Sequence, residues 1–216
     1  TKYGVNYQDI PSDYRSTITI DGHPTIELDF GSLHVSMLYA AEGIEPMVDA
    51  YDIEGLPRDF VKKAILVIIN AGDRTTALKS IEKDSKDMMN RTLLSKKKLR
   101  LKQAYGVCKN FDEALLAIER HHSAIAKYFY TGYGIKLQNT DSIIALEILN
   151  KFANLDIPVL PVHDSFIVDR DQANDLHKVM KFAVVGSGTV DFFVGVGFGA
   201  ESFKRLIFRH DGGQTR

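Results

Sequence analysis

The chain has one cysteine, almost no net charge and no long hydrophobic run. The single cysteine, Cys108, excludes a disulfide bond within the chain and is compatible with a reducing compartment. No apolar run approaches the ~20 residues that a membrane-spanning helix needs. No signal peptide is visible either. From these absences we expect a cytoplasmic protein that has no membrane partner.

The formal net charge of −1 does not by itself indicate a nucleic-acid binder. The distribution of charge says more, because five cations fall within residues 96–102: Lys96, Lys97, Lys98, Arg100 and Lys102. A cationic patch of this kind can follow a phosphate backbone. The alternative is a solvated helix face, which is the usual meaning of a charge run. These five residues are candidates for binding nucleic acid.

Size and patterning indicate an α+β fold. With 216 residues, of which 44% are hydrophobic and 25% charged, the chain can form one large domain or two small ones with a real core. Strand-like and helix-like segments come in mixed order with hairpin connections, which is typical of helices packed with an antiparallel sheet. The first residue is Thr1 rather than Met, so we expect a fragment or a trimmed chain.

Two hairpins and a series of helices are expected. The Asp-Gly pair at 21–22 is a strong turn signal and should join strands over 16–20 and 25–30. A second, apolar hairpin should cover 157–168. Helices are expected over 32–43, 58–71, 110–130, 142–152 and 171–184, with an irregular lead-in over 1–16, two exposed helices within 73–104, a turn at 186–188 and a last strand over 190–196.

Two aspartates stand where a predicted strand meets a turn. Asp29 ends the run 25–30, and Asp164 lies at the tip of the second hairpin. Two carboxylates on neighbouring strand ends can hold Mg²⁺, which prefers oxygen ligands, and the backbone carbonyl of Phe30 can supply another. A charge at the end of a buried strand is costly unless it is paired or metal-bound, which favours a metal site over two ordinary turn residues.

Three segments, in chain order, resemble the motifs of palm-type polymerases. Residues 27–34, Glu-Leu-Asp-Phe-Gly-Ser-Leu-His, are similar to motif A of family A DNA polymerases, and their Asp-Phe-Gly-Ser-Leu core also resembles family B. Residues 58–62, Arg-Asp-Phe-Val-Lys, resemble the Arg-x-x-x-Lys of motif B on the fingers helix. Residues 162–166, Val-His-Asp-Ser-Phe, resemble motif C of family A and of the single-subunit phage RNA polymerases.

The resemblance implies a fold and a set of roles. It implies a palm-like antiparallel sheet packed with helices from 1–45 and 135–216, and a reduced helical fingers-like region from 46–134. The roles that it implies are catalysis and metal binding by Asp29 and Asp164, a metal ligand in Phe30, and triphosphate binding by Arg58 and Lys62. The cofactor would be Mg²⁺, as two ions, with Mn²⁺ as a substitute. The length leaves little room for a thumb and none for an evident exonuclease.

Motif B falls on the expected helix over 58–71. We expect this helix to bury the apolar residues Ile65, Leu66, Ile68 and Ile69. Lys63 is an alternative to Lys62, but adjacent residues on a helix point in different directions, so only one of them can face the triphosphate. The alternative reading of Arg58 and Lys62 is a solvated helix face.

Several positions depart from the family A pattern. Ser165 replaces the usual acidic residue after the motif C aspartate, which is closer to the phage RNA polymerases. His34 stands at the sugar-gate position, where its bulk suits exclusion of a ribose 2′-hydroxyl, and its alternative is a half-buried helix histidine. Asn70 stands where family A has an aromatic residue near the nascent base pair. The resemblance makes His34 and Asn70 candidates for substrate binding.

Two residues near motif C are further candidates for contact with primer or template. Gln138 resembles a family segment that makes such a contact, and His163 precedes the motif C aspartate. Beyond Gln138, Thr140 or Asp141 is expected to cap the helix over 142–152.

The resemblance therefore implies a template-directed nucleotide polymerase, most of all a DNA-directed DNA polymerase of bacterial, phage or plasmid origin. Its expected partners are a nucleic acid template and primer, nucleoside triphosphates, and a replication protein or further domain that supplies a thumb. An RNA polymerase or primase-like enzyme is the nearest alternative, supported by Ser165.

Two other classes stay open. A metal-dependent phosphohydrolase would use His163 with Asp164, and His121 with His122, as ligands for Mn²⁺ or Fe. Against it, His121 and His122 diverge by about 100° on a helix and are expected to be surface residues. A non-catalytic palm would bind nucleic acid through the cations of 96–102 and the aromatic-rich segment 128–133, unless those aromatics are packing residues.

Overall fold

The computed structural model describes residues 7–45, 47 and 49–186 of the 216-residue chain. The chain is α+β, as the sequence predicts, and divides into two compact units. The first unit draws on residues 1–36 and 138–216, and the second on 37–137. The predicted assignment of palm and fingers to the ends and the middle of the chain stays a prediction.

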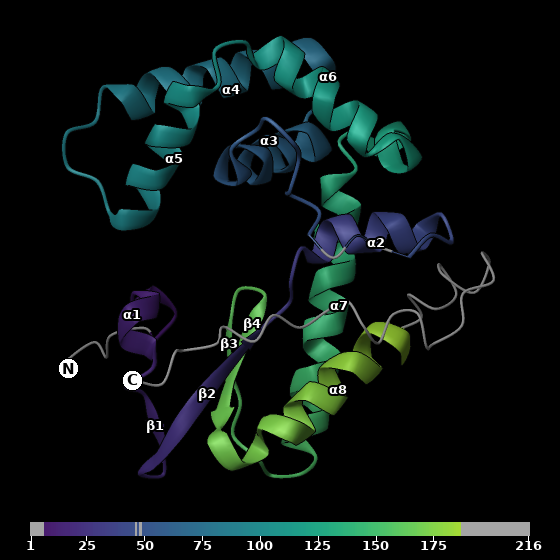
Figure 1. Ribbon diagram of the computed structural model, residues 1–216. Coiled ribbons are helices and arrows are strands. Elements are labelled where there is room, and N and C mark those ends of the chain that lie inside the picture. Colours follow the sequence, from purple (N-terminus) through teal and green to yellow (C-terminus); the bar gives the residue numbers. More distant parts are fainter. Residues whose placement is uncertain (1–6, 46, 48, 187–216) are drawn as a thin grey trace. The chain divides into compact units, whose positions relative to one another are not determined.

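A four-stranded antiparallel sheet lies in the first unit (Figure 1). Its strands follow the order β1-β2-β4-β3 and comprise Thr19–Ile20 (β1), His23–Asp29 (β2), Ser165–Asp169 (β4) and Leu160–Val162 (β3). Asp21 and Gly22 form the two-residue turn between β1 and β2, with φ angles of 52° and 82°. Positive φ at both positions is what an Asp-Gly turn provides, so the sequence signal fixes this turn. Both predicted hairpins are confirmed.

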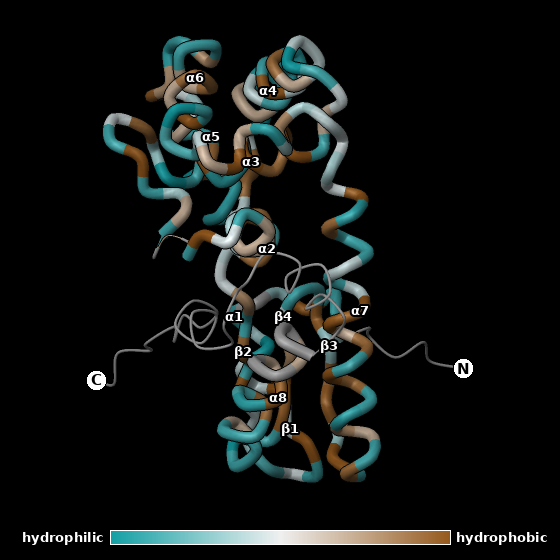
Figure 2. Tube along the Cα trace, turned by 90° about the vertical axis from the view of Figure 1, so that its right-hand side faces the viewer, coloured by the Kyte–Doolittle hydropathy of each residue, from teal (hydrophilic) through white to brown (hydrophobic). Residues whose placement is uncertain are grey.

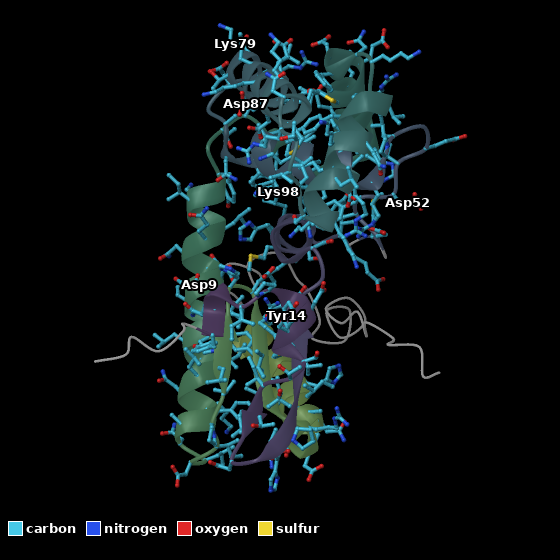
Figure 3. The ribbon with its side chains drawn as sticks, turned by 90° about the vertical axis from the view of Figure 1, so that its left-hand side faces the viewer. Asp9, Tyr14, Asp52, Lys79, Asp87 and Lys98 are labelled. Atoms are coloured by element: carbon cyan, nitrogen blue, oxygen red, sulfur yellow. The ribbon has the colours of Figure 1, made fainter. Side chains whose placement is uncertain are left out.

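Helices lie on both sides of this sheet. α8 (Ala173–Gly186) follows the short η3 (Arg170–Gln172) and packs against β2 and β4. α1 (Ser12–Arg15) lies on the other side (Figures 1 and 3), and it follows the short η1 (Tyr7–Asp9). The sequence predicts an irregular lead-in over 1–16. For the described part of that segment the prediction is wrong, because it contains these two short helices. The core of this unit includes the fully buried side chains Phe152, Phe166, Val168, Leu176 and Met180.

The second unit consists of helices. Those that begin and end within it are Arg58–Asn70 (α3), Arg74–Met89 (α4), Lys96–Val107 (α5), Phe111–His121 (α6) and Ser123–Tyr128 (η2, a 3-10 helix). α3 begins after Pro57, where a proline costs the helix no hydrogen bond. The Asp73 carboxylate caps α4 by accepting a hydrogen bond from the Thr76 N–H at 2.8 Å. α3, α4 and α5 pack on one another, and Phe60 and Ile81 are fully buried.

Two further helices contain the boundaries between the units: α2 (Leu33–Ala41), which confirms the predicted helix after Ser32, and α7 (Gly134–Ala153). Hydrophobic and polar residues alternate along α7 (Figure 2), and Ile144, Ile148 and Phe152 are fully buried. No helix within the described residues is both long enough and apolar enough to cross a membrane.

Two predicted helix boundaries differ from the structure, and two further predictions lie mostly or wholly outside the described residues. The helix expected over 110–130 ends at His121, because His122 leaves the helical conformation (φ −101°, ψ 33°) and the chain continues as the separate 3-10 helix η2. The helix expected over 142–152 begins at Gly134, because no proline or glycine interrupts the residues that follow, so neither Thr140 nor Asp141 caps it. The turn predicted at 186–188 and the strand at 190–196 lie outside the described residues, apart from Gly186, which ends α8.

Candidate active site

The ends of β2 and β4 bring Asp29 and Asp164 next to each other. The antiparallel register places Asp29 opposite Ser165, the residue that follows Asp164. The Phe30 N–H donates a hydrogen bond to the Asp164 carbonyl at 3.4 Å. Neighbouring strands lie about 4.8 Å apart, so the two aspartates start from adjacent backbone positions. The structure therefore joins the two strand ends that the sequence analysis singled out.

Both aspartate side chains are exposed, although Ser165, Phe166, Ile167 and Val168 of β4 are buried. The expectation that burial would make these charges costly is therefore wrong, because the carboxylates stand beyond the buried part of the strands. Exposure fits Mg²⁺, which keeps several waters and is usually held by one or two carboxylates together with phosphates. Within the described residues no group of three or more His, Cys, Asp and Glu side chains is arranged to hold a metal.

The strand that carries Asp29 is anchored from the opposite face of the sheet. The Phe30 side chain is buried and meets the Phe166 ring edge to face, with centroids 6.4 Å apart. On the tip of the β3-β4 hairpin, His163 has a positive φ of 54° and an exposed side chain. The hydrophobic face thus fixes the backbone, while the polar face and the hairpin tip carry the exposed acidic residues.

Two residues that sequence reasoning missed lie beside Asp29. Glu27 shares a sheet face with Asp29 and Ser165, because side chains two apart on a strand and directly opposite on its partner point the same way. Arg15 of α1 binds Glu27 through two hydrogen bonds, Nε to Oε2 at 2.8 Å and Nη2 to Oε1 at 2.6 Å. The Ser165 hydroxyl donates to Glu27 Oε1 at 2.5 Å. The alternation along β2 indicates that Glu27 lies on the same face as Asp29. No local signal in the sequence indicates that Arg15 lies beside them.

The electrostatics of this group follow from these contacts. Burial alone would raise the pKa of Glu27, but the hydrogen bonds from Arg15 and Ser165 outweigh burial and hold that pKa below its usual value. The hydrogen bonds to Glu27 raise the pKa of Arg15, and the charge of Asp29 adds to the increase. Glu27 and Arg15 are therefore both charged at neutral pH.

The other candidates of the first unit lie on helices. His34 of α2 is partly buried, as its alternative reading expects, and its Nε2 lies 3.8 Å from Asp141 Oδ2. Asp141 therefore lies in the interior of α7, close to His34 of α2, instead of capping α7. Gln138 is exposed on the same helix.

Arg58 and Lys62 lie one turn apart on α3 and share one aromatic neighbour. The Arg58 guanidinium binds Asp49 (Nε to Oδ2, 2.8 Å) and lies 5.3 Å from the centre of the Tyr51 ring. Lys62 is exposed, and its ammonium lies 5.8 Å from the same ring centre. Lys63 instead pairs with Asp84 of α4 at 2.7 Å. Of the two lysines, Lys62 is the one that remains available to an anionic ligand.

The end of α3 forms a shallow cavity with α4. Its volume is about 300 Å³, and its lining includes Leu66, Asn70 and Thr76. The exposed Asn70 side chain donates to the Leu66 carbonyl at 2.7 Å. Leu66 is 51% exposed, so the expectation that it is buried with Ile65, Ile68 and Ile69 is wrong. An apolar side chain therefore stands between Lys62 and Asn70 on the exposed side of this helix.

The basic segment opens α5. Lys96, Lys97 and Lys98 are exposed in the first turn after the N-cap Ser95 (Lys98 is labelled in Figure 3). This placement is unfavourable for the helix dipole, which prefers acidic residues at its N-terminus. The other two cations have internal partners. Arg100 lies 3.7 Å from Asp59, and the Lys102 ammonium donates to the Met89 and Arg91 carbonyls at 2.9 and 3.0 Å.

His122 is not the surface residue that the sequence analysis expects. Its side chain is fully buried, with Nε2 2.9 Å from the Ala50 carbonyl and Nδ1 2.9 Å from the Tyr39 hydroxyl. Since a carbonyl only accepts, Nε2 carries the proton and Nδ1 accepts from Tyr39. Burial lowers the pKa of His122 to about 4. This histidine therefore links three segments of the second unit and is no ligand for an external metal.

The aromatic-rich segment 128–133 is mainly occupied with internal contacts. Phe129 is buried, the Tyr128 hydroxyl donates to Glu42, and the Tyr130 hydroxyl donates to Glu119 at 2.6 Å. These contacts agree with the packing alternative for this segment.

Comparison with protein-family models, curated proteins and solved structures finds no match for this chain.

Proposed function

We propose that this chain is a template-directed nucleotide polymerase, in the first place a DNA-directed DNA polymerase, with its catalytic site at the paired ends of β2 and β4 in a palm-like sheet. The observation that carries the proposal is the pairing of β2 with β4, which sets Asp29 beside Asp164 at one end of an antiparallel sheet. Such a site suits phosphoryl transfer, which requires positioning and charge neutralisation more than covalent chemistry from the protein.

In this proposal the donor set consists of hard oxygens. Asp29 and Asp164 would hold two Mg²⁺ ions, or Mn²⁺ in their place, with the Phe30 carbonyl as a further ligand. Bound in this way, the metal supplies charge stabilisation for the attacking and the leaving oxygen of an in-line displacement. Lys62 and Arg58 would bind the triphosphate, and the bulk of His34 would disfavour a ribose.

The test is primer extension on a primed DNA template, with Mg²⁺ and either deoxynucleotides or ribonucleotides. We expect extension that requires Mg²⁺ and prefers deoxynucleotides. Preference for ribonucleotides would favour the RNA polymerase or primase-like alternative that Ser165 supports. If the chain binds primed DNA but extends it with neither substrate, the proposal is wrong and the non-catalytic alternative stands.

Lys62→Ala is expected to raise the dissociation constant of the incoming nucleotide by about 10- to 100-fold, because a hydrogen bond to a charged group contributes about 1.5–3 kcal/mol. Nucleotide titrations in single-turnover extension measure it. Lys63→Ala is the matched control, because Lys63 pairs with Asp84 and should leave this constant unchanged. Equal effects of the two substitutions would contradict the role given to Lys62.

Replacing Lys96, Lys97 and Lys98 by glutamine is expected to weaken the salt dependence of DNA binding. Three lost phosphate contacts reduce the slope of log K against log salt by about 2 to 3. Fluorescence anisotropy with primed DNA at several salt concentrations measures this slope. A triple variant of α4, with glutamine for the exposed Lys79, Lys83 and Lys86, removes the same charge. If both variants change the slope equally, the α5 lysines act only through net charge.

A further inference from the structure

Arg15 is held tightly next to the candidate metal site. Its guanidinium makes the two hydrogen bonds to Glu27 described above, and its Nη1 donates to the Ile10 carbonyl at 3.2 Å. The side chains are only 17% (Arg15) and 27% (Glu27) exposed. Bidentate pairs of this kind are geometrically specific, so the position of the charge is fixed by Glu27.

A cation at this place matters because of what lies beside it. Glu27 and Asp29 point to the same face of β2, two residues apart, and the charge of Asp29 reaches Arg15 strongly enough to contribute to its raised pKa, after the larger contribution of Glu27. An unneutralised guanidinium here would repel a divalent cation and compete with it for the Asp29 carboxylate. With Glu27 bound to it, Arg15 adds almost no net charge to the site.

We propose that Glu27 is a positioning residue that engages Arg15 and so preserves the negative charge of the Asp29–Asp164 site for divalent cations. This inference rests on the proposed function, because it presumes that these two aspartates bind metal. Ser165 supports the arrangement, since its hydroxyl holds the same Glu27 oxygen.

The arrangement predicts opposite effects for the two partners. Glu27→Gln leaves Arg15 charged and unneutralised, and Mn²⁺ affinity should fall about three- to tenfold, the effect of one charge roughly 7 Å from a divalent ion at high dielectric. Arg15→Gln leaves Glu27 negative, and affinity should rise by a similar factor. The double variant removes both charges and should return close to the affinity of the unmodified chain.

Titration of free Mn²⁺ by electron paramagnetic resonance, without nucleotide or DNA, measures these affinities on the whole chain. Circular dichroism melts of each variant report folding. If both single variants weaken Mn²⁺ binding, the pair only attaches α1 to β2, and the inference is wrong. It is also wrong if neither variant changes the affinity.

Asp29→Asn and Asp164→Asn separate this inference from the proposed function. If they abolish Mn²⁺ binding while the Arg15 and Glu27 variants fail to oppose each other, the metal site stands and only the role of Glu27 is overturned. If neither aspartate variant affects Mn²⁺ binding, the metal site itself is absent, and the proposed function falls with the inference.

Discussion

Asp29→Asn and Asp164→Asn should each lower the Mg²⁺-dependent rate of nucleotide addition by about 10³-fold or more. A metal ion that stabilises the transition state contributes several kcal/mol, and each ~1.4 kcal/mol is a factor of ten in rate. Asparagine keeps the shape of the side chain and removes the charge on which the metal depends. Since both carboxylates are exposed, folding should be almost unaffected. Single-turnover primer extension measures the rate.

Asp175→Asn is the matched control for these two variants. Asp175 is an exposed aspartate of α8 in the same unit, and it pairs with the neighbouring Lys178 at 2.9 Å. This substitution should leave the rate within about twofold, as expected for a surface position away from special contacts. If the Asp29 and Asp164 variants behave like Asp175→Asn, the two aspartates have no catalytic role, and the site would have to be sought elsewhere in the chain.

The part of the candidate site that could be predicted from sequence is the part set by local rules. The Asp-Gly turn and the alternation along β2 place Asp29 at a strand end, and the apolar hairpin places Asp164 at its tip. The pairing of β2 with β4 joins the two hairpins in one antiparallel sheet, which is the simplest way to combine them. Pro57 marked the start of α3 in the same local way.

What could not be predicted depends on contacts between distant segments. Arg15 and Glu27 lie 12 positions apart and are brought together by the fold of the first hairpin, so no spacing in the sequence reveals the pair. Leu66 fits the apolar pattern of α3, yet its side chain is exposed. The apolar pattern alone does not show which apolar residues will be buried. His122 follows the end of α6, and its buried side chain bonds to Tyr39 and to the Ala50 carbonyl, both far from it in sequence.

Stability of the second unit should fall as the pH drops below about 6.5, because of His122. Its pKa is about 4 in the folded protein, against about 6.5 when unfolded. Between these values the unfolded state binds the extra proton, so acid favours unfolding, while above pH 6.5 this histidine adds no pH dependence. The loss should be about 2 kcal/mol between pH 7.5 and 5.0, and about 3 kcal/mol by pH 4. Urea unfolding at these pH values measures it.

Acid should also affect the candidate triphosphate site. His122 holds the Ala50 carbonyl, and Ala50 lies between Asp49 and Tyr51. Both of these neighbours contact Arg58. His122→Gln should lower the free energy of unfolding at pH 7.5 and remove most of the loss of stability between pH 7.5 and 5.0. His23→Gln, at an exposed histidine, should leave that loss of stability unchanged. If His122→Gln keeps it too, other groups cause the acid sensitivity. If the slope disappears and nucleotide binding weakens in the same variant, the buried histidine fixes the loop that orients the cations of α3.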